Sequence, residues 1–342
     1  MKIVQMLLFP FSVVYHLITE MRNRLYDQGL KPVASFEIPV VSVGNLTVGG
    51  TGKTPMIEHL VRLLNRRYRV ATLSRGYGRR TKGIRIAGDN DDASSLGDEP
   101  FQFHRKFQGK ISVMVGEDRA LAIPFLIDEK PETRVVLLDD AFQHRRVNPL
   151  FQILLTDYSH PFYKDFLLPA GRLRESKTGA RRADVVVVTK CPREISEEEM
   201  MTIETAIKIY ASKPVFFSTL RYNALVPLGN VTETSDSVVL VTGIANARSL
   251  RQHIESNYRM IRHFDFSDHH AYSASEVREI TDLANRHGAM VITTEKDAVK
   301  LESAALSVFV GNTPFFYLPV EIEFLKNGKD FDEMVLNAVR SY

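Results

Sequence analysis

Short runs of apolar residues alternate with amphipathic stretches along most of this chain. The runs are nearly continuous and rich in valine, isoleucine and leucine, which is typical of β-strands that are covered on both faces. In the first part of the chain they lie at residues 38–44, 69–74, 111–116, 134–140, 151–157 and 184–190. Because helix-length stretches separate the runs, the pattern predicts an α/β fold with a mostly parallel sheet flanked by helices, and it argues against a β-sandwich.

The alternation of strand and helix pauses once and then resumes. Residues 222–237 are rich in turn formers and polar side chains, which favours a boundary between two compact units. Further strand candidates follow at 238–243, 259–266 and 289–294, with helices expected from about Asn246 and Ser273. The pattern therefore predicts three segments, which are an apolar N-terminal helix (1–30), a core unit (31–225) and a smaller C-terminal α/β unit (226–342).

The N-terminal segment needs a separate interpretation, because its apolar part could be mistaken for a membrane span or a signal peptide. As a helix, residues 3–18 would be roughly 24 Å long, which is short of the roughly 30 Å hydrocarbon core of a bilayer. On a helical wheel, one narrow polar stripe collects Gln5, Ser12, His16, Thr19 and Asn23. We therefore expect a helix that lies in the membrane interface, with Arg22 and Arg24 available to anionic head groups. The alternative is a helix packed on the protein's own core.

Composition and charge narrow the classes of function. The 342-residue chain is 44% hydrophobic and 25% charged, as in ordinary globular proteins, and its net charge is only +3. This charge does not indicate a nucleic-acid binder. The single cysteine, Cys191, excludes an internal disulfide framework and a multi-cysteine metal site, and it fits a reducing cytosol. Nothing in the sequence points to an obligate protein partner.

A glycine-rich stretch, NLTVGGTGKTP at 45–55, ends like a phosphate-binding loop. The P-loop pattern G-x-x-x-x-G-K-[ST] asks for a glycine at the position of Thr47. Context favours phosphate binding over a chance turn, because the stretch follows a predicted strand and opens a predicted helix. Main-chain N–H groups and the positive end of the helix can then surround a phosphate. The residues predicted to bind nucleotide in this loop are Gly49, Gly50, Thr51, Gly52, Lys53 and Thr54.

The residues around the loop also restrict its chemistry. Lys53 can reach the β- and γ-phosphates, and the Thr54 hydroxyl can bind Mg²⁺. The magnesium shell further needs a carboxylate at the end of a neighbouring apolar strand, and Asp139 and Asp140 supply it. One large group of P-loop ATPases carries, at the position of Val48, a lysine that reaches a dimer partner's nucleotide. Dimer-switched ATPase activity therefore loses its main chemical support.

Several polar clusters admit a structural and a chemical interpretation. Asp98 and Glu99 precede Pro100, so they can carry chemistry or simply begin a helix. Residues 74–80 and 169–176 place arginines beside glycines, either as anion contacts or as solvated turns.

Two clusters near the C-terminus are equally open. His269 and His270 are adjacent and cannot face the same way in regular structure, which argues against a two-histidine metal site and favours one histidine paired with a carboxylate. Residues 293–301 look like a capped helix start, with Thr294 followed by Asp297.

Eight separated motifs follow one another along the chain. They are VSVGNLTVGGTGKTP, SRGYG, GDEP, GEDR, DDAFQH, PAGRLRE, DHHAY and TTEKDAVK. In this order they resemble the motifs of the tetraacyldisaccharide 4′-kinase family of lipid A biosynthesis, from the N-terminal helix to about residue 301. The chain departs from the commoner family pattern at Ala141, Arg172 and Ser176, and we expect none of these changes to remove chemistry.

The resemblance implies a P-loop NTPase-like fold and an ATP-dependent, Mg²⁺-requiring kinase. Such an enzyme transfers the γ-phosphate of ATP to the 4′-hydroxyl of tetraacyldisaccharide 1-phosphate, which gives lipid IVA. Its partners would be this lipid substrate and the membrane surface, and not nucleic acid. It would work at the cytoplasmic face of the bacterial inner membrane as a peripheral or monotopic protein.

The resemblance also implies catalytic roles. Lys53 would stabilise the β- and γ-phosphates, and Thr54 and Asp139 would hold Mg²⁺. Asp98 would be the general base. A histidine of DHHAY would orient Asp98 and so join the two halves of the chain at the active site, and we choose His269.

Further residues are expected around the nucleotide or the metal on the same basis. They are Asp140, His144, Arg174 and Glu175. Arg75 and Arg119 are candidates for contacts with ATP or with the 1-phosphate of the lipid.

Two other functions stay open from the sequence. A P-loop kinase for a soluble sugar or small metabolite would not need the apolar N-terminus. A nucleotide-dependent switch without an acceptor would not need Asp98 paired with His269.

Overall fold

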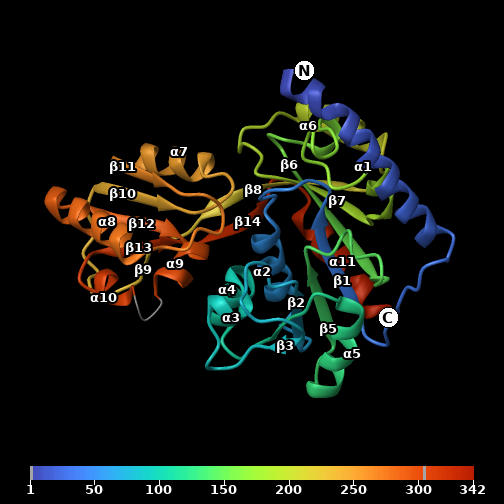
Figure 1. The fold of residues 1–342 in the computed structure, drawn as a ribbon, viewed down its shortest axis with the longest axis horizontal. Helices are drawn as coiled ribbons and strands as arrows, with labels where there is room; N and C mark the ends of the chain where they lie inside the picture. Colours follow the sequence, from blue (N-terminus) through green and yellow to red (C-terminus); the bar gives the residue numbers. More distant parts are fainter. Residues whose placement is uncertain (1–2, 303–305) are drawn as a thin grey trace.

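The structure, a computed structural model, describes residues 3–302 and 306–342, and residues 1 and 2 of the predicted N-terminal helix lie outside this part. Within the described residues, the strands form one nine-stranded and one five-stranded sheet. The two sheets belong to two α/β units that lie side by side, and two long strands run between them (Figure 1). The two predicted α/β units are therefore present.

The larger unit is built on the nine-stranded sheet. Its strands are β1 (Val40–Asn45), β2 (Val70–Ser74), β3 (Arg85–Ile86), β4 (Ser112–Val115), β5 (Val135–Asp139), β6 (Phe151–Asp157), β7 (Val185–Thr189), β8 (Val215–Tyr222) and β14 (Val320–Phe324). Their order in the sheet is β14-β8-β7-β6-β1-β5-β2-β4-β3. Neighbouring strands from β8 to β4 are parallel, and antiparallel β14 and β3 form the two edges. The predicted mostly parallel sheet is confirmed.

Helices cover both faces of this sheet, which explains the continuous apolar runs. The helices of the larger unit are α1 (Ile3–Asp27), α2 (Lys53–Leu64), α3 (Ala93–Leu96), α4 (Asp98–Phe107), α5 (Arg119–Glu129), α6 (Glu197–Lys208) and α11 (Gly328–Arg340), with short 3₁₀ turns at Phe162–Lys164 and Lys177–Arg182. One face packs against α2, α4 and α11, and the other packs against α5 and α6. Every residue of β1, β2, β5 and β7 is buried, as expected for strands between two helical layers.

The smaller unit repeats this design. It contains β9 (Val226–Pro227), β10 (Ser237–Thr242), β11 (Arg259–Asp265), β12 (Met290–Thr294), β13 (Phe315–Leu318), α7 (Arg248–Asn257), α8 (Ala274–His287), α9 (Glu295–Leu301) and α10 (Ser307–Val310). The strand order is β11-β10-β12-β13-β9, and all neighbours except β13 and β9 are parallel. Helix α7 covers one face, and α8 and α10 cover the other.

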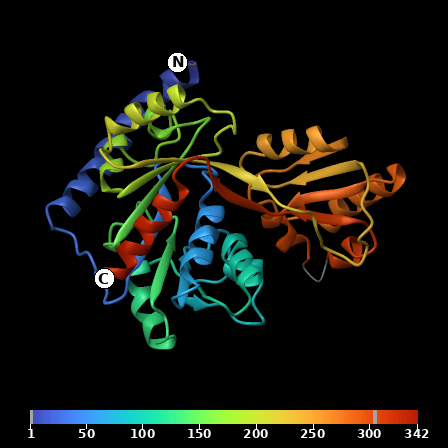
Figure 2. The same cartoon turned by 180° about the vertical axis from the view of Figure 1, so that it is seen from behind.

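The predicted extent of the C-terminal unit, 226–342, is wrong at its end. After β13 the chain returns to the larger unit, where β14 pairs with β8 and α11 lies beside α2 (Figure 2). Phe331 and Val335 of α11 are fully buried in the larger core, and Asp332 lies 2.7 Å from His59 of α2. The pairing of β14 joins residues about 100 positions apart, so no local pattern indicates it.

Helix α1 lies along the outside of the larger unit (Figure 1). Its polar side faces that unit. The Ser12 hydroxyl donates to the carbonyl of Leu167 at 3.0 Å, and the Tyr15 hydroxyl donates to the carbonyl of Arg174 at 2.8 Å. The apolar side is exposed, at Met6, Leu7, Phe9, Phe11, Val13, Val14, Leu17, Ile18 and Met21. Among the described residues, no helix combines the length and the apolarity needed to cross a bilayer.

One detail of the predicted α1 surface is wrong. Arg22 does not face outward, because its guanidinium donates to the carbonyl of Gln143 at 2.6 Å and the residue lines a cavity between the two units. Arg24, whose side chain is 72% exposed, is the outward cation of this turn.

Candidate active site

The predicted phosphate-binding loop connects β1 to α2. Gly49 and Gly52 have φ angles of +107° and +80°, which glycine adopts without strain. In the part of the chain that the structure describes, no side chain caps the N-terminus of α2, so its first N–H groups are available to a ligand. The end of β7 supports the loop, because the hydroxyl of Thr189 donates to the carbonyl of Thr51 at 2.9 Å and Lys190 donates to the carbonyl of Gly50. The positions that need glycine are therefore Gly49 and Gly52, which are nearer to Lys53 than Thr47 is, and Thr47 does not have to be a glycine.

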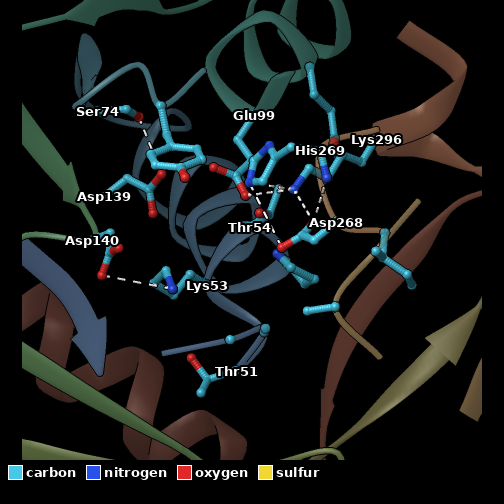
Figure 3. A pocket seen from close by; sticks show the side chains of 18 of the residues that line it. Thr51, Lys53, Thr54, Ser74, Glu99, Asp139, Asp140, Asp268, His269 and Lys296 are labelled. Carbon is cyan, nitrogen blue, oxygen red and sulfur yellow. Dashed lines mark hydrogen bonds and ion pairs between the residues drawn. The ribbon is translucent and has the colours of Figure 1, made fainter. Parts of the chain in front are cut away.

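A cluster of charges lies directly in front of the loop. Lys53 Nζ is 3.8 Å from Asp140 Oδ1 (Figure 3). Arg174 contacts both carboxylate oxygens of Asp140 at 2.7 and 3.1 Å. Burial alone would raise the pKa of Asp140, but Lys53 and Arg174 hold it well below its usual range. Asp140 thus stays ionised and keeps both cations beside the loop.

Asp139 has the properties of a metal ligand. It ends β5, which pairs with β1, and Val43 and Asp139 are partners in the register. Its Oδ2 accepts a hydrogen bond from the Ser74 hydroxyl at 3.3 Å, whereas its buried Oδ1 has no hydrogen-bond partner within residues 3–302 and 306–342. Burial, followed by the charges of Glu99 and Asp140, raises the pKa of Asp139 to about 7.

The donors present fit Mg²⁺. Thr54 and Asp139 line the same cavity, and both offer hard oxygen atoms. Among the described residues, no group of three or more histidine, cysteine, aspartate and glutamate side chains could hold a metal ion alone. Mg²⁺ is usually held by one or two carboxylates with waters and substrate phosphates, so a sparse protein site is the expected arrangement.

Asp98 and His269 meet across the boundary between the two units. Asp98 is the first residue of α4, and His269 follows β11 with a φ angle of +60°. The Oδ2 of Asp98 lies 3.0 Å from Nδ1 of His269. Burial would raise the pKa of Asp98, but the contact with His269 and the charges of Lys300 and Lys296 lower it below its usual value. The adjacent His270 points elsewhere, where it stacks on Phe266 with ring centroids 4.3 Å apart.

Sequence reasoning missed two lysines of α9. Thr294 caps this helix and its hydroxyl bonds Asp297, so the structural interpretation of residues 293–301 is correct. On the same helix, the Nζ of Lys296 lies 3.2 Å from Nε2 of His269. The Nζ of Lys300 lies 3.5 Å from Oδ2 of Asp98. The only sequence signal was their spacing of four on a helix that begins at the end of a strand.

One cavity of about 930 Å³ lies between the two units, and its lining includes Lys53, Thr54, Asp139, Asp140, Arg174, His269 and Lys296. Asp98 and Lys300 are not lining residues, but Asp98 contacts His269 and its neighbour Glu99 lines the cavity. It is formed by the carboxyl ends of β1, β2, β5 and β7 in the larger sheet and of β10, β11 and β12 in the smaller one. In both sheets the cavity lies where neighbouring strands connect in opposite directions, the usual ligand position in open α/β sheets.

The remaining predicted residues divide into two groups. Arg75, Arg119 and His144 line the cavity, and burial together with the charge of Arg119 lowers the pKa of His144 to about 4. Glu175 does not line it, so the expectation that Glu175 contacts a ligand is wrong.

The reason is that neighbouring side chains already surround the Glu175 carboxylate. It is 2% exposed and accepts hydrogen bonds from Asn23 at 3.0 Å, Gln143 at 2.9 Å and Arg182 at 2.8 Å. Glu175 therefore anchors α1 to the larger unit.

Comparison with known proteins identifies the family. A family model described as tetraacyldisaccharide-1-P 4′-kinase, LpxK, matches residues 4–340. The chain belongs to this family. It is 41% identical to a tetraacyldisaccharide 4′-kinase of Flavobacterium johnsoniae over 99% of this chain and 98% of that protein, and 42% identical to one of Flavobacterium psychrophilum over 100% and 98%. The protein is therefore an enzyme, a kinase of the tetraacyldisaccharide 4′-kinase family.

A solved structure supports the same assignment. A crystal structure of LpxK from Aquifex aeolicus in complex with ATP superposes with a TM-score of 0.77 at 29% sequence identity, covering 98% of this chain and 100% of that one. The α/β architecture described above is thus that of a tetraacyldisaccharide 4′-kinase family member.

Proposed function

We propose that this kinase transfers the γ-phosphoryl group of ATP to the 4′-hydroxyl of tetraacyldisaccharide 1-phosphate and so forms lipid IVA in lipid A biosynthesis. The names of its relatives and the ATP in the Aquifex aeolicus LpxK crystal support the donor and the acceptor. The observation that carries the proposal is the Asp98–His269 contact, because His269 and Glu99, the residue after Asp98, line the same cavity as the phosphate-binding loop.

The loop and its charges would bind the triphosphate. Main-chain N–H groups of residues 49–54 would surround the β-phosphate, and Lys53 would move from Asp140 to the phosphate oxygens. Thr54 and Asp139 would hold Mg²⁺, which would neutralise charge on the phosphate oxygens when bound. Arg174 would keep Asp140 in place as Lys53 leaves it.

Asp98 would act as the general base for the acceptor hydroxyl. Its lowered pKa keeps it ionised at neutral pH, and His269 holds one of its oxygens, which leaves the other for the hydroxyl proton. Because Asp98 belongs to the larger unit and His269 to the smaller one, the base is complete only when the two units are together.

The exposed apolar side of α1 suits a substrate that stays in the bilayer. Each acyl CH₂ exposed to water costs about 0.8 kcal/mol, so a tetraacylated lipid does not leave the membrane readily. Helix α1 presents its apolar side outward, while Arg22 on its inner side lines the active-site cavity. The helix would therefore seat the protein on the cytoplasmic face of the inner membrane with the cavity at head-group depth.

The test is phosphate transfer from labelled ATP to tetraacyldisaccharide 1-phosphate in mixed micelles. Lys53→Ala and Asp98→Ala should each lower kcat at least about 100-fold, the range expected for a lost electrostatic or acid–base group. Lys208→Met, a change on the exposed face of α6, is the control. Transfer to a soluble sugar but not to the lipid would identify a different acceptor. Phosphate release that no acceptor stimulates would indicate a nucleotide-dependent switch and overturn the proposal.

A further inference from the structure

Lys296 makes a contact that the proposed mechanism has not used. Its Nζ lies 3.2 Å from Nε2 of His269 (Figure 3). The other ring nitrogen of His269, Nδ1, lies 3.0 Å from Oδ2 of Asp98. The same ammonium is 3.0 Å from Asp268 and 3.4 Å from Glu99. Lys296 therefore joins α9, the loop after β11 and the start of α4 at one point.

In the contact between Lys296 and His269, the lysine must be the hydrogen-bond donor. Burial alone would lower the pKa of Lys296, but the carboxylates of Glu99 and Asp268 raise it above its usual value, so the side chain is an ammonium. An ammonium has three donors and no acceptor, and Nε2 of His269 must then accept through its lone pair. The imidazole proton consequently sits on Nδ1 and is donated to Asp98.

We propose that Lys296 is a positioning residue that holds His269 as the neutral Nδ1–H tautomer, so that Asp98 alone takes the proton of the acceptor hydroxyl. The inference rests on the proposed function. In the transfer step the hydroxyl proton moves to Asp98 and the hydroxyl oxygen bonds the γ-phosphorus. The bond from that phosphorus to the bridging oxygen breaks, and ADP leaves with the electron pair.

The charges around the ring favour this arrangement. The groups that face His269 or its partner carboxylate are Asp98, Glu99, Tyr77, Asp268, Lys296 and Lys300. A second proton on His269 would place a cation beside the Lys296 ammonium, which like-charge repulsion disfavours. Without Lys296 that repulsion disappears, and the ring lies between two carboxylates, those of Asp98 and Asp268, that favour the imidazolium.

Nitrogen NMR of the full-length protein with ¹⁵N-labelled histidine reads the tautomer directly. His269 is assigned among the ten histidines as the signal missing from His269→Gln. The inference requires an unprotonated Nε2 in the wild type and, at the same pH, a larger fraction of doubly protonated ring in Lys296→Met. Lys300→Met, which removes a cation on the Asp98 side, should keep the wild-type tautomer. A proton on Nε2 in the wild type would overturn the inference.

Kinetics give the second readout. Lys296→Met should lower kcat about 10- to 100-fold with the KM for ATP within about threefold, and its kcat should fall more steeply than that of the wild type as the pH is lowered. Lys296→Cys followed by alkylation with 2-bromoethylamine restores an ammonium and should restore the wild-type pH profile. The native Cys191 does not interfere, because it is 2% exposed and burial raises the pKa of its thiol to about 12. Identical pH profiles for Lys296→Met and the wild type would refute a role in tautomer control.

The two proposals can fail separately. If the wild type does not phosphorylate the lipid, the proposed function fails, whereas the NMR experiment still reports the tautomer of His269. If the wild type phosphorylates the lipid but Lys296→Met leaves both the tautomer and the pH profile unchanged, only the inference about Lys296 fails.

Discussion

A buried cluster of charges between the two units should make Lys106 a determinant of stability. Lys106 Nζ lies 2.7 Å from Glu58 of α2 and 2.6 Å from Glu295 of α9. The side chains of Lys106, Glu58 and Glu295 are 18%, 1% and 12% exposed, so solvent screens these contacts only weakly. Gln102 of α4 and Arg62 of α2 also contact Glu58, at 2.9 and 3.3 Å.

Lys106→Met keeps most of the side-chain volume and removes the charge. Breaking a buried ion pair by removing one partner costs about 3–5 kcal/mol, because the other charge is left unpaired. Since Gln102 and Arg62 remain beside Glu58, we expect Lys106→Met to lower the free energy of unfolding by about 3 kcal/mol, the lower end of this range. Lys208→Met breaks an exposed pair with Glu204 on one helix and should cost only about 0.5 kcal/mol.

The loss of unfolding free energy in Lys106→Met should grow as the pH rises. Burial raises the pKa of Glu58 above its usual 4.5, and Lys106 opposes this rise. A carboxyl group with a raised folded-state pKa favours folding while it is protonated and opposes folding once it ionises. Removing Lys106 raises that pKa further, so the variant should lose little below pH 4.5 and progressively more as the pH rises through the folded-state pKa.

Urea unfolding of the wild type, Lys106→Met, Lys208→Met and Lys106→Met/Glu58→Gln measures these differences. The double variant should recover at least about 1 kcal/mol relative to Lys106→Met, because its buried carboxylate is gone. If Lys106→Met costs no more than Lys208→Met, or if its loss does not depend on pH, the reasoning about the cluster is wrong.

Two further predictions follow from the site and from α1. Because the pKa of Asp139 is about 7, protons should compete with Mg²⁺ for its carboxylate. The apparent Mg²⁺ affinity in the kinase assay should therefore rise about tenfold per pH unit below pH 7 and level off above it. Equal Mg²⁺ affinity at pH 6 and pH 8 would contradict this. Leu7→Glu and Leu17→Glu should each weaken binding to anionic vesicles at least about tenfold, since burying one leucine contributes about 1.5–3 kcal/mol. A flotation assay measures this binding, with Lys208→Met as the control. If flotation of the two leucine variants is unchanged, α1 is not the membrane contact.

The parts of the fold that the sequence predicts are those with a local cause. Continuous apolar runs predict the buried strands, and the glycine loop between strand and helix predicts the start of α2. The neighbouring strand end that carries Asp139 follows from the same rule, since β5 pairs with β1. The return of β14 and α11 to the larger unit has no such cause, because a strand pairs with whichever edge the tertiary structure brings to it.

The candidate site shows the same division between local and long-range signals. Residues within one motif, such as Lys53 and Thr54, can be assigned roles from spacing alone. Lys296 cannot, because the capped start of α9 already explains its neighbours Thr294 and Asp297, and its contact with His269 depends on how two loops meet. Glu175 was misassigned for the converse reason, since its motif is near the site while its side chain contacts α1.

The path of the chain explains why the two units can share one site. The chain enters the smaller unit through β8 and returns through β14, and these two strands pair antiparallel at the edge of the larger sheet. Two paired crossings restrict rotation between the units more than a single linker would, and α4 and α9 then meet through Lys106 and Glu295. The carboxyl edges of both sheets consequently face one cavity, and His269 in its lining lies 3.0 Å from Asp98 of the other unit. A site assembled in this way depends on long-range pairing, which is why a stability defect at Lys106 should also lower kcat.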